Sequence, residues 1–113
     1  MLPKNNRLKK RNDFKKVYKM GRRFKKDGLS LLILENNLPF SRFAFVFPKK
    51  EEKKAVKRNK FKRQISEIVR ANLQFIKPGF DGIFLLSKSL IGKNNSQLNF
   101  LVNQLLISAK ILK

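Results

Sequence analysis

The feature of this sequence that most restricts its fold is the stretch 53–73, where a dense basic run continues directly into an amphipathic helical pattern. At 100° per residue, four apolar side chains fall within an arc of roughly 100°, the width of a buried stripe: Phe61, Ile65, Ile68 and Val69. We therefore expect a helix that packs against a core along this face.

The opposite face of this helix is polar and mainly basic. Asn59, Arg63 and Arg70 project there, and Glu67 stands four residues after Arg63, where it can orient that side chain. An ordinary amphipathic helix carries such charges only for solubility. The density of Lys and Arg between Lys49 and Arg63 favours instead a surface that meets an anion, because an anion offsets the repulsion between like charges.

The charge of the whole chain points the same way. There are 28 Lys and Arg against 7 Asp and Glu, which gives a net charge of +21 and a pI near 11.0. Of these, 22 cations and 5 acids lie in residues 1–63. The expected partner is a polyanion, bound mainly by this first part of the chain.

The residues that are absent exclude whole classes of activity. The chain has no Cys and no His, and none of its seven carboxylates stands in a spacing typical of an acid–base pair or a two-metal cluster. We expect neither catalytic residues nor a metal site on the protein. No apolar run approaches 18 residues and the N-terminus MLPKNNRLKK lacks a signal-peptide core, so we expect a cytoplasmic protein.

A length of 113 residues with 42% hydrophobic residues and eleven Phe suits one domain, residues 1–113, with a real core. Residues 1–11 are basic and read as a flexible arm. A first helix is expected from an N-cap at Asn12 to a stop at Gly21. Phe14, Val17 and Tyr18 share one face of it, and such a stripe is more often core than binding surface.

The strands follow from short apolar runs. Residues 29–34 read as a buried strand, and residues 42–47 alternate between Phe and smaller or charged side chains. We expect these two to form an antiparallel hairpin, with Phe24 in a strand or bulge before it. Residues 82–86 predict a further strand, parallel to 42–47 through the helical crossover, and Ser96 is expected to cap a final packing helix. The order predicts the α+β class.

The run Ala55-Val56-Lys57-Arg58-Asn59-Lys60-Phe61-Lys62-Arg63 resembles the signature of the protein subunit of bacterial ribonuclease P, Ala-Val-x-Arg-Asn-Arg-x-Lys-Arg. The likeness extends to Arg7-Leu8-Lys9-Lys10, Asp13-Phe14, Tyr18, Pro48-Lys49-Lys50, Gly79-Phe80-Asp81 and Lys88. The departures are Lys60 and Ser66, where the family has Arg, and the acids Glu51-Glu52 in a loop that is usually basic or neutral. Lys60 keeps the charge but loses the planar fork of Arg.

The resemblance implies a two-layer α-β sandwich with a mixed four-stranded sheet, three helices and a left-handed crossover. It also implies a role in removing the 5′ leader from precursor tRNA. In that enzyme the RNA subunit carries the catalytic centre and its Mg²⁺, and the protein holds the leader and strengthens substrate and metal binding. The implied partners are the ribonuclease P RNA and precursor tRNA, with no membrane and no small-molecule substrate.

Two sets of residues are carried over from the family. The resemblance assigns contacts with the catalytic RNA to Lys57, Arg58, Asn59, Lys60, Lys62 and Arg63. It assigns the cleft for the precursor leader to Phe14, Tyr18, Ser30, Leu32, Lys49, Lys50 and Lys88.

Other classes of protein share this charge and size. A basic ribosomal protein or a general RNA chaperone is the main alternative, and the ordered signature is what speaks against it. A peripheral membrane protein fits less well, because no helix joins a Lys-rich face to a long exposed aromatic face.

Overall fold

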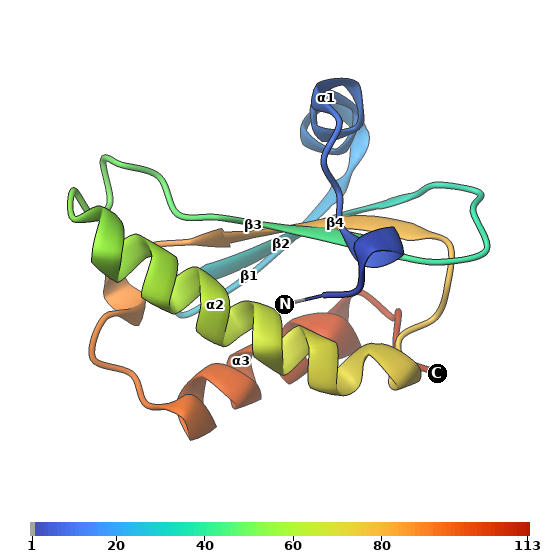
Figure 1. Cartoon of the computed structure of the whole chain (residues 1–113). Coiled ribbons are helices and arrows are strands. Elements are labelled where there is room, and N and C mark those ends of the chain that lie inside the picture. Colours follow the sequence, from blue (N-terminus) through green and yellow to red (C-terminus); the bar gives the residue numbers. More distant parts are fainter. Residues whose placement is uncertain (1) are drawn as a thin grey trace.

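The computed structural model describes residues 2–113, which form three α-helices and one four-stranded sheet (Figure 1). In chain order the elements are α1 (Arg11–Met20), β1 (Arg22–Lys26), β2 (Leu29–Glu35), β3 (Arg42–Val46), α2 (Ala55–Asn72), β4 (Phe80–Leu86) and α3 (Asn95–Ser108). Short 3₁₀ turns occupy Lys4–Asn6, Leu73–Phe75 and Lys88–Leu90. Within residues 2–113, no helix has the length and apolar character needed to cross a bilayer. The predicted α+β class is confirmed.

The sheet has the strand order β1-β2-β4-β3, so β4 lies between the two strands that precede it in the chain. β3 pairs parallel with β4, as predicted from the intervening helix, and the other two pairings are antiparallel. The expected hairpin between β2 and β3 is wrong. β2 forms its hairpin with β1 instead, through a turn at Asp27 and Gly28, whose φ angles of 46° and 91° belong to the left-handed region.

The central place of β4 has a cause in its side chains. Ile83 and Phe84 point to opposite faces of the sheet and neither has any exposed surface. A strand that is apolar on both faces gains most from a position with neighbours on both sides. β4 therefore occupies the position that the hairpin prediction had given to β3.

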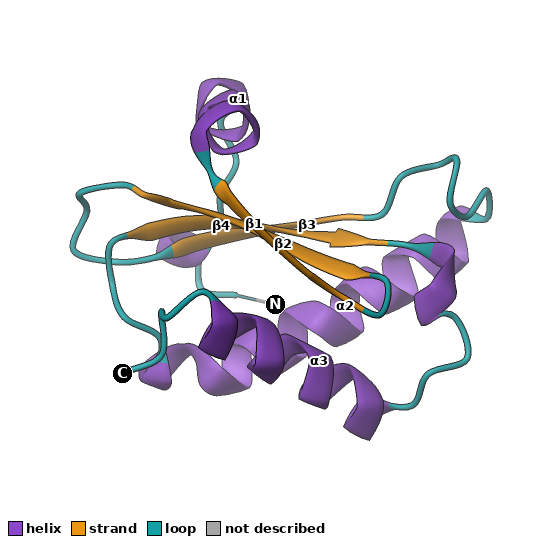
Figure 2. Ribbon diagram, turned by 180° about the vertical axis from the view of Figure 1, so that it is seen from behind, coloured by secondary structure: helices purple, strands orange, loops and turns teal. Residues whose placement is uncertain are grey.

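The two faces of the sheet are covered differently. α2 and α3 lie together on one face, whereas α1 stands alone on the other (Figures 1 and 2). The larger core, between the sheet and α2 and α3, includes Phe43, Ile65, Phe84 and Leu101. The smaller one, under α1, consists of the buried residues Leu8, Val17, Leu32, Ala44 and Ile83.

The faces predicted from periodicity are confirmed. All four residues of the apolar stripe on α2 are buried, with Ile65 and Val69 at 0% exposure. In β3 and just after it, Phe43 and Phe47 belong to the larger core, whereas Ala44 belongs to the smaller one. The alternation of this strand therefore supplies both cores at once.

Residues 2–11, expected to form a flexible arm, are packed against the fold. Leu2 is 2% and Leu8 is 4% exposed. The Leu8 N–H donates to the carbonyl oxygen of Phe43 (3.0 Å), and the Asn6 side chain donates to that of Ser41 (2.8 Å). These bonds cover part of the outer edge of β3. Met1, also included in the expected arm, lies outside the described residues.

Two helix starts differ from the prediction. α1 begins at Arg11 after Lys10, without a side-chain cap, so Asn12 lies inside the helix. α3 is capped by Asn94 and not by Ser96, because Asn94 and Gln97 form a reciprocal capping box, with both bonds at 2.9 Å.

Candidate nucleic-acid interface

The first two turns of α2 present the basic run to solvent. Lys57, Asn59, Lys60 and Arg63 are exposed, whereas Arg58 and Lys62 are partly buried. Exposure follows from the helical period, because the buried stripe at Phe61 and Ile65 turns the intervening residues outward. Five cations therefore stand within nine residues of one helix end.

Arg58 differs from the other signature cations in its local contacts. Its Nη1 donates to the carbonyl oxygens of Glu52 (2.9 Å) and Lys53 (2.8 Å). The side chain of Glu52 in turn accepts from the Lys54 N–H (3.1 Å). Arg58 thus holds the segment that leads into α2, so part of its role is structural.

Three of the predicted residues meet in one groove between α2 and β3. Asn59, Lys62 and Arg63, with Phe45 and Ser66, line a hollow of about 450 Å³, which we call the signature groove. The Phe45 ring stacks on Phe84 with centroids 5.6 Å apart and planes 8° apart. Two cations, an amide and an aromatic surface are the groups that bind a nucleic-acid backbone and its bases.

Phe45 and Ser66 were not predicted as part of this groove. The alternation of residues 42–47 placed Phe45 with Phe43 and Phe47 on the core face, which is correct. What makes its ring accessible is the position of β3 at the edge of the sheet, and only the strand order reveals that. Ser66, one of the departures from the family, is 8% exposed beside the groove.

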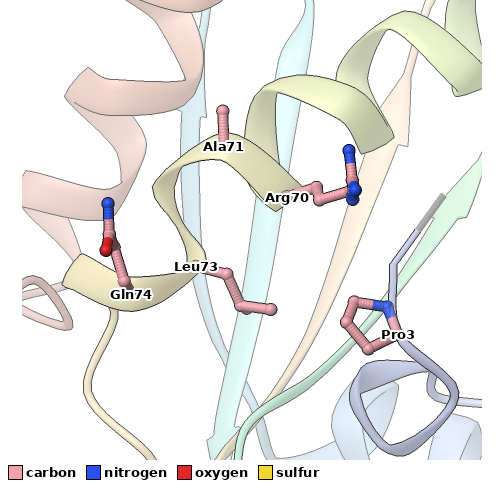
Figure 3. A pocket seen from close by; sticks show the side chains of 5 residues that line it. All are labelled: Pro3, Arg70, Ala71, Leu73 and Gln74. Carbon is pink, nitrogen blue, oxygen red and sulfur yellow. The ribbon is translucent and has the colours of Figure 1, made fainter.

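The far end of α2 offers less to a polyanion. A hollow of about 590 Å³ lies there, lined by Pro3, Arg70, Ala71, Leu73 and Gln74, whose side chains Figure 3 shows. Arg70 is the one cation among these five residues, and its Nη1 lies 3.4 Å from the Glu67 carboxylate. This salt bridge offsets the charge that Arg70 could offer to a ligand.

Three residues of the predicted leader cleft come together on the α1 side of the sheet. Ser30, Lys50 and Lys88 line a hollow of about 470 Å³, which we call the rim hollow, together with Lys25 and Leu85 among others. Lys49 precedes Lys50 on the same exposed loop. Lys25 was not predicted, although its position in a strand opposite Ser30 places it on this face.

Side-chain bonds tie the walls of the rim hollow together. The Glu51 carboxylate accepts from the Lys88 N–H (3.1 Å), which joins the loop after β3 to the turn after β4. The Ser87 hydroxyl donates to the carbonyl oxygen of Gly28 (2.8 Å), which adds the β1–β2 turn. Glu51, a departure from the family, therefore has a positioning role beside Lys50 and Lys88.

The remaining predicted leader residues lie outside the rim hollow. Phe14 is partly buried and packs against the smaller core, whereas Tyr18 is 41% exposed on the same helix. Burial raises the pKa of the Tyr18 hydroxyl above its usual value of 10.0, against a smaller lowering by Arg23. Leu32 is 0% exposed beneath α1, so the prediction that it lines an open cleft is corrected: α1 covers this part of β2 and leaves Ser30 uncovered.

An ion-pair network fixes α1 over the sheet. Arg42 donates two bonds to the Asp81 carboxylate (2.7 and 2.8 Å), and Asp13 of α1 lies 3.4 Å from the same guanidinium. Asn36 also donates to Asp81 (2.8 Å). The bond to Asp81 raises the pKa of Arg42 and outweighs the opposite effect of burial. Arg42 therefore carries its charge at any physiological pH and links α1 to β3 and β4.

Known proteins share both the sequence and this architecture. The family model for Ribonuclease P matches residues 2–110. The ribonuclease P protein component of Pseudanabaena sp. is 39% identical over 113 residues, covering 99% of this chain and 97% of that protein. The component of Microcystis aeruginosa is 39% identical over 115 residues, covering 98% and 96%.

Solved structures agree with the sequence comparison. The RNase P protein of Staphylococcus aureus superposes with a TM-score of 0.86 at 26% identity, covering 96% of this chain and 98% of that one. The RNase P protein of Thermotoga maritima gives a TM-score of 0.81 at 32% identity, covering 88% and 96%. The family model spans nearly the whole chain, and the resemblance first seen in the α2 signature is confirmed: this chain belongs to the ribonuclease P protein family.

Proposed function

We propose that this chain binds the RNA subunit of ribonuclease P through the signature groove and holds the 5′ leader of precursor tRNA on the α1 side of the sheet. The observation that carries the proposal is the meeting of Asn59, Lys62 and Arg63 with the Phe45 ring in one groove. The family to which the chain belongs acts in tRNA processing.

The signature groove suits a folded RNA. Its cations come from a helix whose first two turns carry no acid, so phosphate groups can approach without meeting a negative charge. Arg63 is exposed and offers the planar guanidinium that binds phosphate through two parallel bonds. Binding of this kind releases counterions and weakens steeply as salt is added.

The rim hollow suits a single strand. Lys25, Lys50 and Lys88 supply positive charge around it, and Leu85 supplies an apolar surface between them. Tyr18 adds an exposed aromatic ring on the α1 side. A positively charged groove next to an aromatic side chain is the combination that holds single-stranded nucleic acid without strict sequence preference.

The part of the protein in the reaction is binding. The chain has no His or Cys, and within residues 2–113 no three Asp or Glu side chains gather in a group that could hold a metal ion. Asp81, which is buried, is engaged by Arg42. We therefore assign the chemistry and the Mg²⁺ to the RNA subunit, and to the protein the neutralisation of phosphates where the two RNAs meet.

Reconstitution tests the proposal. The purified protein is added to a bacterial ribonuclease P RNA at a magnesium concentration too low for the RNA alone, with precursor tRNA as substrate. We expect 5′ cleavage to be restored, and no cleavage by the protein without the RNA. A triple variant Asn59→Ala, Lys62→Ala and Arg63→Ala should fail to restore it, whereas Lys77→Ala, an exposed cation at the other end of the molecule, should behave as the unchanged protein.

Two outcomes would contradict the proposal. Specific 5′ cleavage by RNA-free protein would place the chemistry on the protein. Equal stimulation by the triple variant would show that charge alone is at work, as expected of a general RNA chaperone.

A further inference from the structure

A second hollow lies on the other side of the β1–β2 turn from the rim hollow. It measures about 300 Å³ and is lined by Asp27, Lys93, Ser96, Gln97, Phe100 and Leu101, and we call it the turn hollow. Figure 2 shows α3, which carries most of these residues, on the face of the sheet opposite α1. No residue of this hollow belongs to the family signature or to the predicted leader cleft.

An aromatic ring and a cation meet at this place. Phe100 is 55% exposed, although five other apolar residues of the same helix are buried: Leu98, Leu101, Val102, Leu105 and Leu106. The Lys26 ammonium lies 6.0 Å from the centroid of its ring. Lys93, which lines the turn hollow with Phe100, is a second cation. The ring thus offers a stacking surface with two positive charges nearby.

β1 connects this hollow with the rim hollow. The strand is at the free edge of the sheet and carries four cations among its five residues. Because successive side chains point to opposite faces, Lys25 lines the rim hollow while Lys26 reaches Phe100. Lys25 and Lys26 therefore place a positive charge at each of the two hollows. A strand of RNA that leaves the rim hollow would reach the turn hollow by crossing the β1–β2 turn.

Surface exposure alone does not explain this arrangement. Ile107, on the same helix, is also 55% exposed, but it carries no aromatic ring and lines none of the hollows described above. Phe100 differs in its ring, its neighbouring lysines and its position beside the path from the rim hollow. Lys26 and Lys93 outnumber Asp27, the acid that lines the hollow, and this positive balance favours a nucleic acid over an apolar peptide as the occupant.

We propose that the leader of precursor tRNA continues from the rim hollow across the β1–β2 turn, and that a base in its 5′-distal part stacks on Phe100. Lys26 and Lys93 neutralise the phosphates on either side of that base. This inference rests on the proposed function, since it extends the same single strand. It makes leader length, and not leader sequence, the property that this surface recognises.

The test uses the reconstituted holoenzyme with precursors whose leaders are shortened from the 5′ end one nucleotide at a time. Phe100→Ala is compared with Ile107→Ala, a matched loss of an equally exposed side chain from the same helix. We expect Phe100→Ala to weaken binding of long-leader precursors by at least about 5-fold. Below a threshold length, and for mature tRNA, both variants should bind as the unchanged protein. Lys26→Ala should reduce the salt dependence for long leaders by about one unit.

Three results would overturn the inference: equal loss at every leader length, equal loss with Ile107→Ala, or no loss on the longest leader. Failure of this inference and failure of the proposed function give different results. If Lys50→Ala weakens short-leader precursors while Phe100→Ala changes nothing, the rim hollow stands and the extension is wrong. If the unchanged holoenzyme shows no dependence on the leader at all, the proposed leader role itself fails.

Discussion

The two faces of the sheet differ in how completely they are covered. On one face, α2 and α3 seal a core that takes in most of the buried residues, and the residues of the signature groove lie outside it along α2 and β3. On the other face, α1 covers five buried residues and leaves the rest of the sheet open, with Ser30 and Leu85 in the rim hollow. Stability therefore comes mainly from the first face, which leaves the second free to carry the proposed binding surface.

The largest expected effect tests the stability part of this comparison. Phe84→Ala removes a fully buried ring that contacts Phe43 and Phe45 in the larger core. We expect the free energy of unfolding to fall by about 3–5 kcal/mol, measured by urea denaturation. Phe75→Ala, at a ring that is 54% exposed, is the control and should change little. A loss no larger than that of Val17→Ala under α1 would mean that the two faces contribute equally.

The next effect concerns what holds α1 in place. Asp81→Ala leaves Arg42 without its two-bond partner and removes an acceptor from Asn36. We expect a loss of about 2–3 kcal/mol in the free energy of unfolding, because bonds to a charged group in a partly buried site are lost. Glu35→Ala, at an exposed acid in β2, is the control. If both variants unfold at the same urea concentration, the smaller core alone orients α1.

A functional difference should appear on the α1 side. Tyr18→Ala removes an exposed ring and should weaken binding of precursor tRNA by about 1–3 kcal/mol, with mature tRNA bound as before. Phe14→Ala should lower Tm as well, because Phe14 packs against the smaller core. Affinities for both RNAs and the two Tm values separate these cases. Equal loss for precursor and mature tRNA would return Tyr18 to a structural role.

On the α2 side the expected change is in the electrostatic part of binding. Arg63→Ala should lower the slope of log K against log salt for the RNA subunit by about one unit. Arg70→Ala should matter less, because Arg70 is paired with Glu67 and lies outside the signature groove. If the two variants proved equally damaging, the whole helix face would be the contact and the groove would lose its distinct role.

The smallest effect concerns pH. Burial raises the pKa of Tyr18 in the folded state, so its contribution to stability is fully present below pH 10.0, the ordinary value, and is lost as pH rises through the higher folded value. Tyr18→Phe removes this titration. The unchanged protein should therefore lose stability relative to Tyr18→Phe above pH 10, in urea titrations at matched ionic strength, and a difference that stays constant would mean that the hydroxyl is solvated.

What the sequence could predict was set by local periodicity. The stripe on α2 and the alternation of β3 identified which side chains are buried, because a period determines a face without knowledge of the partner. The signature likewise placed Asn59, Lys62 and Arg63 together, since they lie within one and a half turns of a helix.

What could not be predicted depends on contacts between distant segments. Nothing in the sequences of β2 and β3 indicates that β4 lies between them in the sheet. The short connection from β2 to β3 was therefore taken for a hairpin turn. Leu32 was expected in an open cleft. Its burial could not be predicted, because it depends on how far α1 extends over the sheet. The accessibility of Phe45 and the contact of Glu51 with Lys88 depend in the same way on the strand order and on the packing of loops.

The strand order also governs how the chain can be made. β4, the strand that lies between β2 and β3 in the sheet, is completed only at Leu86. The strands β1, β2 and β3 are therefore synthesised before the strand that pairs with both β2 and β3. Such unpaired edges are the usual starting points of aggregation during synthesis. Here 22 of the 28 cations belong to residues 1–63, which are synthesised before β4. We expect the charge that we propose for RNA binding also to keep unfinished chains apart by repulsion, so loss of basic residues should lower the yield of folded protein.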